Sequence, residues 1–167
     1  MDTRKRRIIL VRHGETEWNS AFRFQGRTDV PLRESGLAQA DLLARRLAGA
    51  RLDKVYTSPL ARARQTASAI ARMNESVREV TAVDGLSEMS FGRWEGLRIS
   101  EIRELHPDLF SSWSKDPSST TPPGGEGFSD LIVRVSRALE GILSGEGDNL
   151  VVVCHGGTIR ALLSLLI

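Results

Sequence analysis

Apolar residues occur along the chain in two alternating patterns, which predict strands and helices in turn. Short runs of apolar and β-branched residues are typical of buried strands, and they fall at residues 8–11, 54–57 and 149–154 and, more weakly, at 77–83. Repeats at helical spacing fall at residues 35–48, 58–73, 100–105 and 129–143, and again after residues 156–157. Strands that alternate with helices predict an α/β layer fold with a mostly parallel central sheet.

The short helix at 100–105 is expected to end at His106-Pro107, because the residue before a proline disfavours helical geometry.

The least regular stretch covers residues 114–127, which hold three prolines and three glycines. Long loops inside compact domains are usually functional or disordered. We therefore expect residues 114–127 to contribute to the edge of a binding site.

Composition and charge narrow the class of protein. The chain has 167 residues, and we expect a single domain over residues 1–167. With 40 % apolar and 26 % charged residues it is typical of a folded globular protein, and its net charge of +2 predicts no nucleic-acid partner. The early apolar run at 8–11 is too short for a signal peptide or a membrane span. Since the lone Cys154 excludes an internal disulfide framework, a cytoplasmic protein without a membrane partner is expected.

The last residues, 161–167, form an apolar helical segment without a cap or a polar tail. Either the chain is truncated at this end, or a partner surface covers it. A homodimer is therefore one expectation.

Two strands lead into a histidine followed by glycine. The run at 8–11 ends at Arg12-His13-Gly14, and the run at 149–154 ends at His155-Gly156-Gly157. Ligands of open α/β sheets bind at the carboxyl ends of the strands, so both histidines are expected at one edge. Arg62 lies in the first turn of a helix that starts at the same edge. Free N–H groups at glycine turns and helix N-termini suit an anion.

Each histidine taken alone is more often a structural, hydrogen-bonded residue. A metal site is the other alternative, but catalytic zinc takes three protein ligands and structural zinc four. Beyond His13 and His155, the sequence contains one further histidine, His106, as a candidate metal ligand. Cys154 is expected to face away from His155, because neighbouring side chains on a strand point to opposite faces. We therefore expect neither a metal nor another cofactor.

Six blocks of the sequence carry a resemblance to a known family, and they follow one another in the family's order over nearly the whole chain. They are Arg12-His13-Gly14-Glu15-Thr16, Phe24-Gln25-Gly26-Arg27-Thr28-Asp29, Ser58-Pro59-Leu60-Ala61-Arg62, Leu86-Ser87-Glu88 with Phe91-Gly92-Arg93-Trp94-Glu95-Gly96, Pro123-Gly124-Gly125-Glu126, and Cys154-His155-Gly156-Gly157. Together they resemble the histidine phosphatase superfamily, which includes phosphoglycerate mutases and many phosphomonoesterases. The resemblance implies a three-layer α/β/α sandwich of the phosphoglycerate mutase type.

The resemblance also implies a mechanism. His13 is the implied nucleophile, because a neutral imidazole can attack a phosphate dianion and form a phosphohistidine. Arg12, Arg62 and His155 are the implied clamp for the phosphate oxygens, with His155 protonated when phosphate is bound. Glu88 matches the general acid, which requires a carboxyl that is protonated near neutral pH.

Further residues follow from the same blocks. The implied substrate contacts are Asn19, Gln25, Gly26, the N–H of Gly156, and Trp94 as a wall of the pocket. Trp94 taken alone is equally well read as a core residue. Glu15 and Glu95 compete with Glu88 for the role of the acid.

The compact stretch from Glu88 to His155 resembles phosphatases more than mutases of the family. The implied activity is a metal-independent, acid-type hydrolysis of small phosphate esters, with α-ribazole phosphatases and broad-specificity phosphatases as the nearest branches. A phosphoglycerate mutase and a catalytically silent phosphate-binding scaffold remain as alternatives. The pocket edge formed by Phe22, Arg23, Phe24 and residues 114–127 is expected to decide the substrate.

Overall fold

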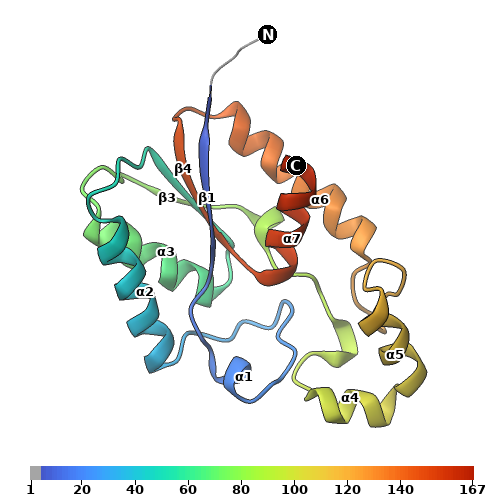
Figure 1. Cartoon of the computed structure of the whole chain (residues 1–167). Helices are drawn as coiled ribbons and strands as arrows, with labels where there is room; N and C mark the ends of the chain where they lie inside the picture. The colour runs from blue at the N-terminus through green and yellow to red at the C-terminus, as the bar shows by residue number, and fades with distance from the viewer. Residues whose placement is uncertain (1–4) are drawn as a thin grey trace.

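The computed structural model describes residues 5–167 and is built on a four-stranded sheet (Figure 1). The strands are β1 (Arg7–Arg12), β2 (Lys54–Thr57), β3 (Val80–Ala82) and β4 (Asn149–Cys154), and their spatial order is β1-β4-β2-β3. Every pairing is parallel. The expected mostly parallel sheet is therefore confirmed, and residues 1–4 of the expected domain lie outside the described part.

Helices cover both faces of the sheet, which makes the three layers of an α/β/α sandwich (Figure 1). They are α1 (Glu17–Ser20), α2 (Glu34–Leu47), α3 (Ala61–Met73), α4 (Ile99–Leu105), α5 (Pro107–Lys115), α6 (Phe128–Ser144) and α7 (Gly156–Leu166), with short 3₁₀ turns η1 (Asp84–Leu86) and η2 (Gly92–Trp94). The chain moves across the sheet in one direction from β1 to β3 and returns to β4. Because such crossovers are right-handed, α2 and α3 pack on one face and α6 on the other.

Strand β4 lies between β1 and β2 and is buried on both faces. Val151 and Val153 face the core under α2 and α3, whereas Leu150 and Val152 face the core under α6 and α7. This burial explains why the strand is a continuous apolar run rather than an alternating one. Parallel strands end together, so His13 after β1 and His155 after β4 lie at one edge of the sheet.

The structure differs from the expected elements at two prolines. Pro107 ends α4 and also opens α5, because proline is well tolerated at the first helical position; this helix was not predicted. The helical pattern predicted over residues 58–73 includes Pro59, but α3 begins after this proline, with Leu60 as its N-cap. The hydroxyl of Ser58 instead accepts a hydrogen bond from the Leu60 N–H at 3.3 Å.

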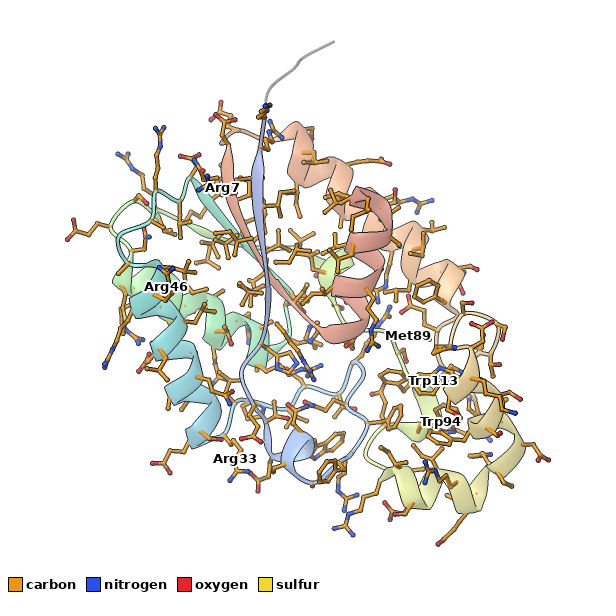
Figure 2. All side chains as sticks on the ribbon, in the orientation of Figure 1. Arg7, Arg33, Arg46, Met89, Trp94 and Trp113 are labelled. Atoms are coloured by element: carbon orange, nitrogen blue, oxygen red, sulfur yellow. The ribbon has the colours of Figure 1, made fainter. Side chains whose placement is uncertain are left out.

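A smaller aromatic cluster packs beside the sheet and joins α4 and α5 to the loops at its carboxyl edge (Figure 2). Its buried residues are Trp94, Ile102 and Phe110, with Trp113 packed against them. The ring of Trp94 lies 5.6 Å from that of Trp113 between centroids. Of these residues, Trp113 lines the cavity described below.

The turn after β1 packs very closely against α2, and glycines make this approach possible. A Cβ on Gly36 would lie 2.0 Å from the carbonyl oxygen of Glu15, and one on Gly14 would lie 2.5 Å from that of Gly36. The atoms met by these added carbons belong to the backbone, which cannot move aside as easily as the end of a long side chain. The glycines therefore fix the segment that directly follows His13.

We predict that Gly36→Ala lowers the free energy of unfolding by roughly 2–4 kcal/mol, because the added methyl group meets backbone. Gly141→Ala is the matched control, since Gly141 lies in α6 with no atom within 4 Å of the added carbon. That change should raise stability by about 0.5–1 kcal/mol. Urea unfolding of both variants measures the difference, and equal effects would show that the Gly36 contact is not tight.

Candidate active site

The two histidines predicted to meet do so at the carboxyl edge of the sheet. The imidazole centroids of His13 and His155 are 5.1 Å apart. His13 is 8 % exposed and His155 is fully buried. Both side chains are therefore within reach of one small anion.

A backbone contact orients the His13 ring. Its Nδ1 lies 2.7 Å from the carbonyl oxygen of Gly14, so Nδ1 carries the proton and donates it to that carbonyl. Burial, reinforced by the nearby charges of Arg62 and Arg12, outweighs this hydrogen bond and lowers the pKa of His13 to about 4. His13 is thus neutral at physiological pH and keeps Nε2 available as a nucleophile.

His155 caps the N-terminus of α7 and is held by a residue that the sequence did not single out. Its Nε2 lies 2.7 Å from the hydroxyl of Ser58, and its Nδ1 is buried without a hydrogen-bond partner among residues 5–167. Burial, together with the charge of Arg62, holds the pKa of His155 far below its ordinary value. The ring is therefore neutral in the absence of a bound anion.

Arg62 projects from the first turn of α3 and is almost fully buried, at 1 % exposure. Its two terminal nitrogens donate to the carbonyls of Thr28 and Gly26 at 2.9 and 2.7 Å. Its Nε is buried and has no partner in the described part of the chain. Burial lowers the pKa of Arg62, although the carboxylates of Glu88 and Asp29 oppose this.

The predicted polar contacts come from the end of β1 and the segment that follows it. Arg12, Asn19, Gln25 and Gly26 all line one cavity. The Thr16 hydroxyl contacts the side-chain oxygens of Asn19 and Gln25 at 3.1 and 2.8 Å, which turns their amide nitrogens away from Thr16. In residues 5–167 these amide nitrogens have no protein partner, so they are available to a ligand.

Glu88 lies against the N-terminus of α7. Its carboxylate accepts hydrogen bonds from the N–H groups of Gly157 at 3.1 Å and Thr158 at 3.2 Å. A Cβ on Gly157 would lie 2.5 Å from a carboxylate oxygen of Glu88, so this glycine is required for the approach. These two donors and the Met89 N–H, at 2.9 Å, hold the carboxyl of Glu88 at the edge of the cavity.

The competing carboxylates have other contacts. Glu95 accepts hydrogen bonds from the N–H groups of Thr28 at 3.0 Å and Phe91 at 3.0 Å, and it does not line the main cavity. Glu15 accepts a hydrogen bond from Ser35 and also lies outside that lining. Of these three carboxylates, Glu88 is the one that lines the main cavity together with His13.

The cavity holds about 470 Å³ and has one polar end and one apolar side. Its apolar wall is formed by Phe24, Met89, Phe91, Trp113, Phe128 and Leu131. Arg23, Arg160 and the segment 116–118 complete the edge. Of the predicted edge, Phe22 is absent from the lining and is 74 % exposed.

The expectation that Trp94 lines the pocket is wrong. Trp94 is fully buried in the aromatic cluster and is absent from the lining of the cavity (Figure 2). Trp113, on the helix that was not predicted, supplies the indole at this wall. His155 is also outside the lining, because it lies fully buried next to His13.

Two features are absent from residues 5–167, namely a cluster of metal ligands and a membrane-spanning helix. No group of three or more His, Cys, Asp or Glu side chains there could hold a metal ion. No helix among these residues is long and apolar enough to cross a membrane.

Comparison with known proteins identifies the class to which this fold and site belong. Residues 8–167 match the model of the histidine phosphatase superfamily (branch 1). A metal-independent phosphoserine phosphatase of Arabidopsis thaliana is 42 % identical over 93 % of this chain and 66 % of its own length. The adenosylcobalamin/alpha-ribazole phosphatase of Salmonella typhimurium is 33 % identical over 96 % of this chain and 79 % of its own.

A solved structure agrees with these sequence relatives. The alpha-ribazole phosphatase of Shigella flexneri superposes with a TM-score of 0.83 at 31 % identity, covering 96 % of this chain and 79 % of its own. The chain belongs to the histidine phosphatase superfamily. It is a phosphatase, a hydrolase of the α/β/α fold that the resemblance implied.

The depressed pKa of His13 predicts a pH dependence of stability. Below about pH 6.5 the unfolded chain binds a proton on this residue that the folded protein does not, so stability falls from there towards pH 4. The loss approaches about 3 kcal/mol, at about 1.4 kcal/mol per pH unit. His13→Gln should remove this contribution, which urea unfolding between about pH 7 and 4.5 measures. If the free energy of unfolding changed equally with pH in the wild type and in His13→Gln, His13 would not be buried as a neutral ring.

Proposed function

We propose that the protein hydrolyses small phosphate monoesters through a phosphohistidine on His13. The observation that carries the proposal is the orientation of the His13 ring, whose Nδ1 is bound to the carbonyl of Gly14 at 2.7 Å. This leaves a neutral Nε2 at the polar end of a cavity that also presents Arg12 and Arg62. A neutral nucleophile avoids the charge repulsion that an anion would meet at a phosphate dianion.

Two buried donors support the binding of a phosphate group at this place. The Nε of Arg62 and the Nδ1 of His155 have no hydrogen-bond partner among residues 5–167. Buried polar atoms are almost always paired, so their partner is expected to be a ligand. The Ser58 hydroxyl accepts from the Leu60 N–H and can give its own proton to Nε2 of His155, so that Nδ1 of His155 carries a proton towards the ligand.

Phosphate oxygens would satisfy both of these donors. Arg12, the amide of Asn19 and the N–H of Gly156 complete the proposed clamp. Such donors act on the charge that develops on the equatorial oxygens in the transition state. A bound dianion also favours the protonated form of His155, which strengthens its hydrogen bond.

The reaction proceeds in two displacements. In the first, Nε2 of His13 bonds to phosphorus, the ester P–O bond breaks, and the Glu88 carboxyl gives its proton to the leaving oxygen. In the second, water attacks phosphorus, Glu88 takes the proton of the water, and the bond to His13 breaks. Glu88 thus ends each cycle protonated again, and inorganic phosphate leaves.

We predict that His13→Ala reduces turnover of p-nitrophenyl phosphate by at least about a thousandfold, because the nucleophile is lost. A phosphoryl label that is acid-labile and base-stable should be trapped on the wild type and be absent from the variant. His106→Ala, which removes an imidazole outside the cavity lining, is the matched control and should keep its activity.

EDTA should leave the rate of the wild type unchanged, because both proposed displacements use groups of the chain and water, without a metal ion. Loss of activity in EDTA with recovery on addition of zinc or magnesium would contradict the phosphohistidine route. So would a His13→Ala variant that retains much of the wild-type rate.

For Glu88, we predict a dependence on the leaving group. An alkoxide needs the proton in the transition state and a nitrophenolate hardly does. Glu88→Gln should therefore lose on the order of a hundredfold more rate on glycerol 2-phosphate than on p-nitrophenyl phosphate. Equal losses on both substrates, measured at saturating substrate, would show that Glu88 only positions the phosphate.

For the substrate, we propose a phosphate monoester that carries an aromatic or otherwise apolar group, with α-ribazole 5′-phosphate as the candidate. The apolar wall of Phe24, Met89, Phe91, Trp113, Phe128 and Leu131 supports this choice. Phosphoserine, the substrate class in the names of other relatives, would place two charges against that wall. A panel of α-ribazole 5′-phosphate, phosphoserine and 3-phosphoglycerate compares kcat/KM, and formation of 2-phosphoglycerate from the last would indicate a mutase.

A further inference from the structure

One block of the sequence, Pro123-Gly124-Gly125-Glu126, takes no part in the chemistry described above. Its glutamate faces Arg134, in the second turn of α6. Nε and Nη2 of Arg134 donate to the two carboxylate oxygens of Glu126 at 2.7 and 2.8 Å. This two-point ion pair is largely buried, with side-chain exposures of 19 % for Arg134 and 11 % for Glu126.

The remaining donors of Arg134 reach the segment that carries Glu88. Nη1 donates to the carbonyls of Gly85 and Ser87, both at 2.8 Å. Nη2 donates to the carbonyl of Glu88 at 3.0 Å. A guanidinium has five N–H donors, and here all five have an acceptor. Arg134 therefore joins three carbonyls of residues 85–88 to the Glu126 carboxylate.

Two glycines allow the segments around Glu88 and Glu126 to pack closely against their neighbours. A Cβ on Gly85 would lie 2.8 Å from the Cβ of Ala138 in α6. One on Gly125 would lie 2.6 Å from the carbonyl oxygen of Ser90. The N–H of Glu126 also donates to the Ser90 carbonyl at 2.8 Å, and its carboxylate accepts from the Ser90 N–H at 3.3 Å. The segment around Glu88 is thus fixed on both sides.

The charge state of the pair suits a permanent contact. Burial acts to raise the pKa of Glu126, but hydrogen bonds from Arg134 and its charge outweigh this and lower it. Arginine stays protonated in proteins. Glu126 and Arg134 therefore remain ionised near neutral pH.

We propose that Arg134 and Glu126 form a positioning pair that holds the proton-donating Glu88 at the leaving-group side of the cavity. The inference rests on the proposed role of Glu88 as the acid. The backbone of Glu88 is fixed by Arg134, and its carboxyl is fixed by the N–H groups of Gly157 and Thr158. Neither member of the pair lines the cavity, so neither is expected to contact substrate.

The test compares substrates with good and poor leaving groups. Arg134→Gln should lose on the order of tenfold more kcat on glycerol 2-phosphate than on p-nitrophenyl phosphate, since a displaced acid matters where the proton is needed. Arg134→Lys keeps the charge but has three donors in place of five, and it should show a smaller difference in the same direction. If Arg134→Gln does not fold, as thermal unfolding would reveal, Arg134→Lys carries the test. Arg137→Gln, an exposed change on the same helix, is the matched control and should leave both rates unchanged.

A double-mutant cycle separates this inference from the proposed function. In a Glu88→Gln background, Arg134→Gln should add no further selective loss on the alkyl substrate, because the acid is already absent. Equal losses of Arg134→Gln on both substrates, or full additivity with Glu88→Gln, would overturn the positioning role. Glu88→Gln without any leaving-group dependence would instead overturn the proposed acid, and with it the basis of this inference.

Discussion

The site depends on two imidazoles placed 5.1 Å apart at the ends of adjacent parallel strands. The register of β1 and β4 aligns Arg12 with Cys154, so the residues that follow each strand leave the sheet together. Both rings are buried close to the guanidinium of Arg62, and they remain neutral for that reason. The site therefore keeps the imidazole of His13 unprotonated beside positive charge and unpaired donors, as the proposed attack on a phosphate dianion requires.

The proposed acid is positioned in a different way. Glu88 follows η1 rather than a strand, and it depends on contacts from two helices: the N-terminus of α7 for its carboxyl and Arg134 of α6 for its backbone. These helices pack on the same face of the sheet, opposite α2 and α3 (Figure 1). The proposed nucleophile, His13, is thus fixed by the sheet and the proposed acid, Glu88, by the helical layer, and both residues line the cavity.

Local patterns were sufficient to predict the strands and the histidine pair, because a buried strand that ends in His-Gly is a feature of neighbouring residues. They were insufficient for Trp94 and Trp113, since only the packing of α4 and α5 decides which indole is buried and which reaches the cavity. Helix α5 was missed because Pro107 both ends one helix and opens the next. The contacts of Ser58 with His155 and of Arg134 with residues 85–88 join segments far apart in the sequence, so no local pattern contains them.

The proposed chemistry requires that His13 is a neutral imidazole with its proton on Nδ1, and nitrogen NMR of the ring can test this. In protein labelled with ¹⁵N on histidine, we predict that at neutral pH the His13 Nδ1 resonance is that of an N–H and the Nε2 resonance is that of an unprotonated nitrogen. His13→Gln assigns the signals. A ring protonated on Nε2, or on both nitrogens, would contradict the proposed role of His13 as nucleophile, because Nε2 would then have no free lone pair.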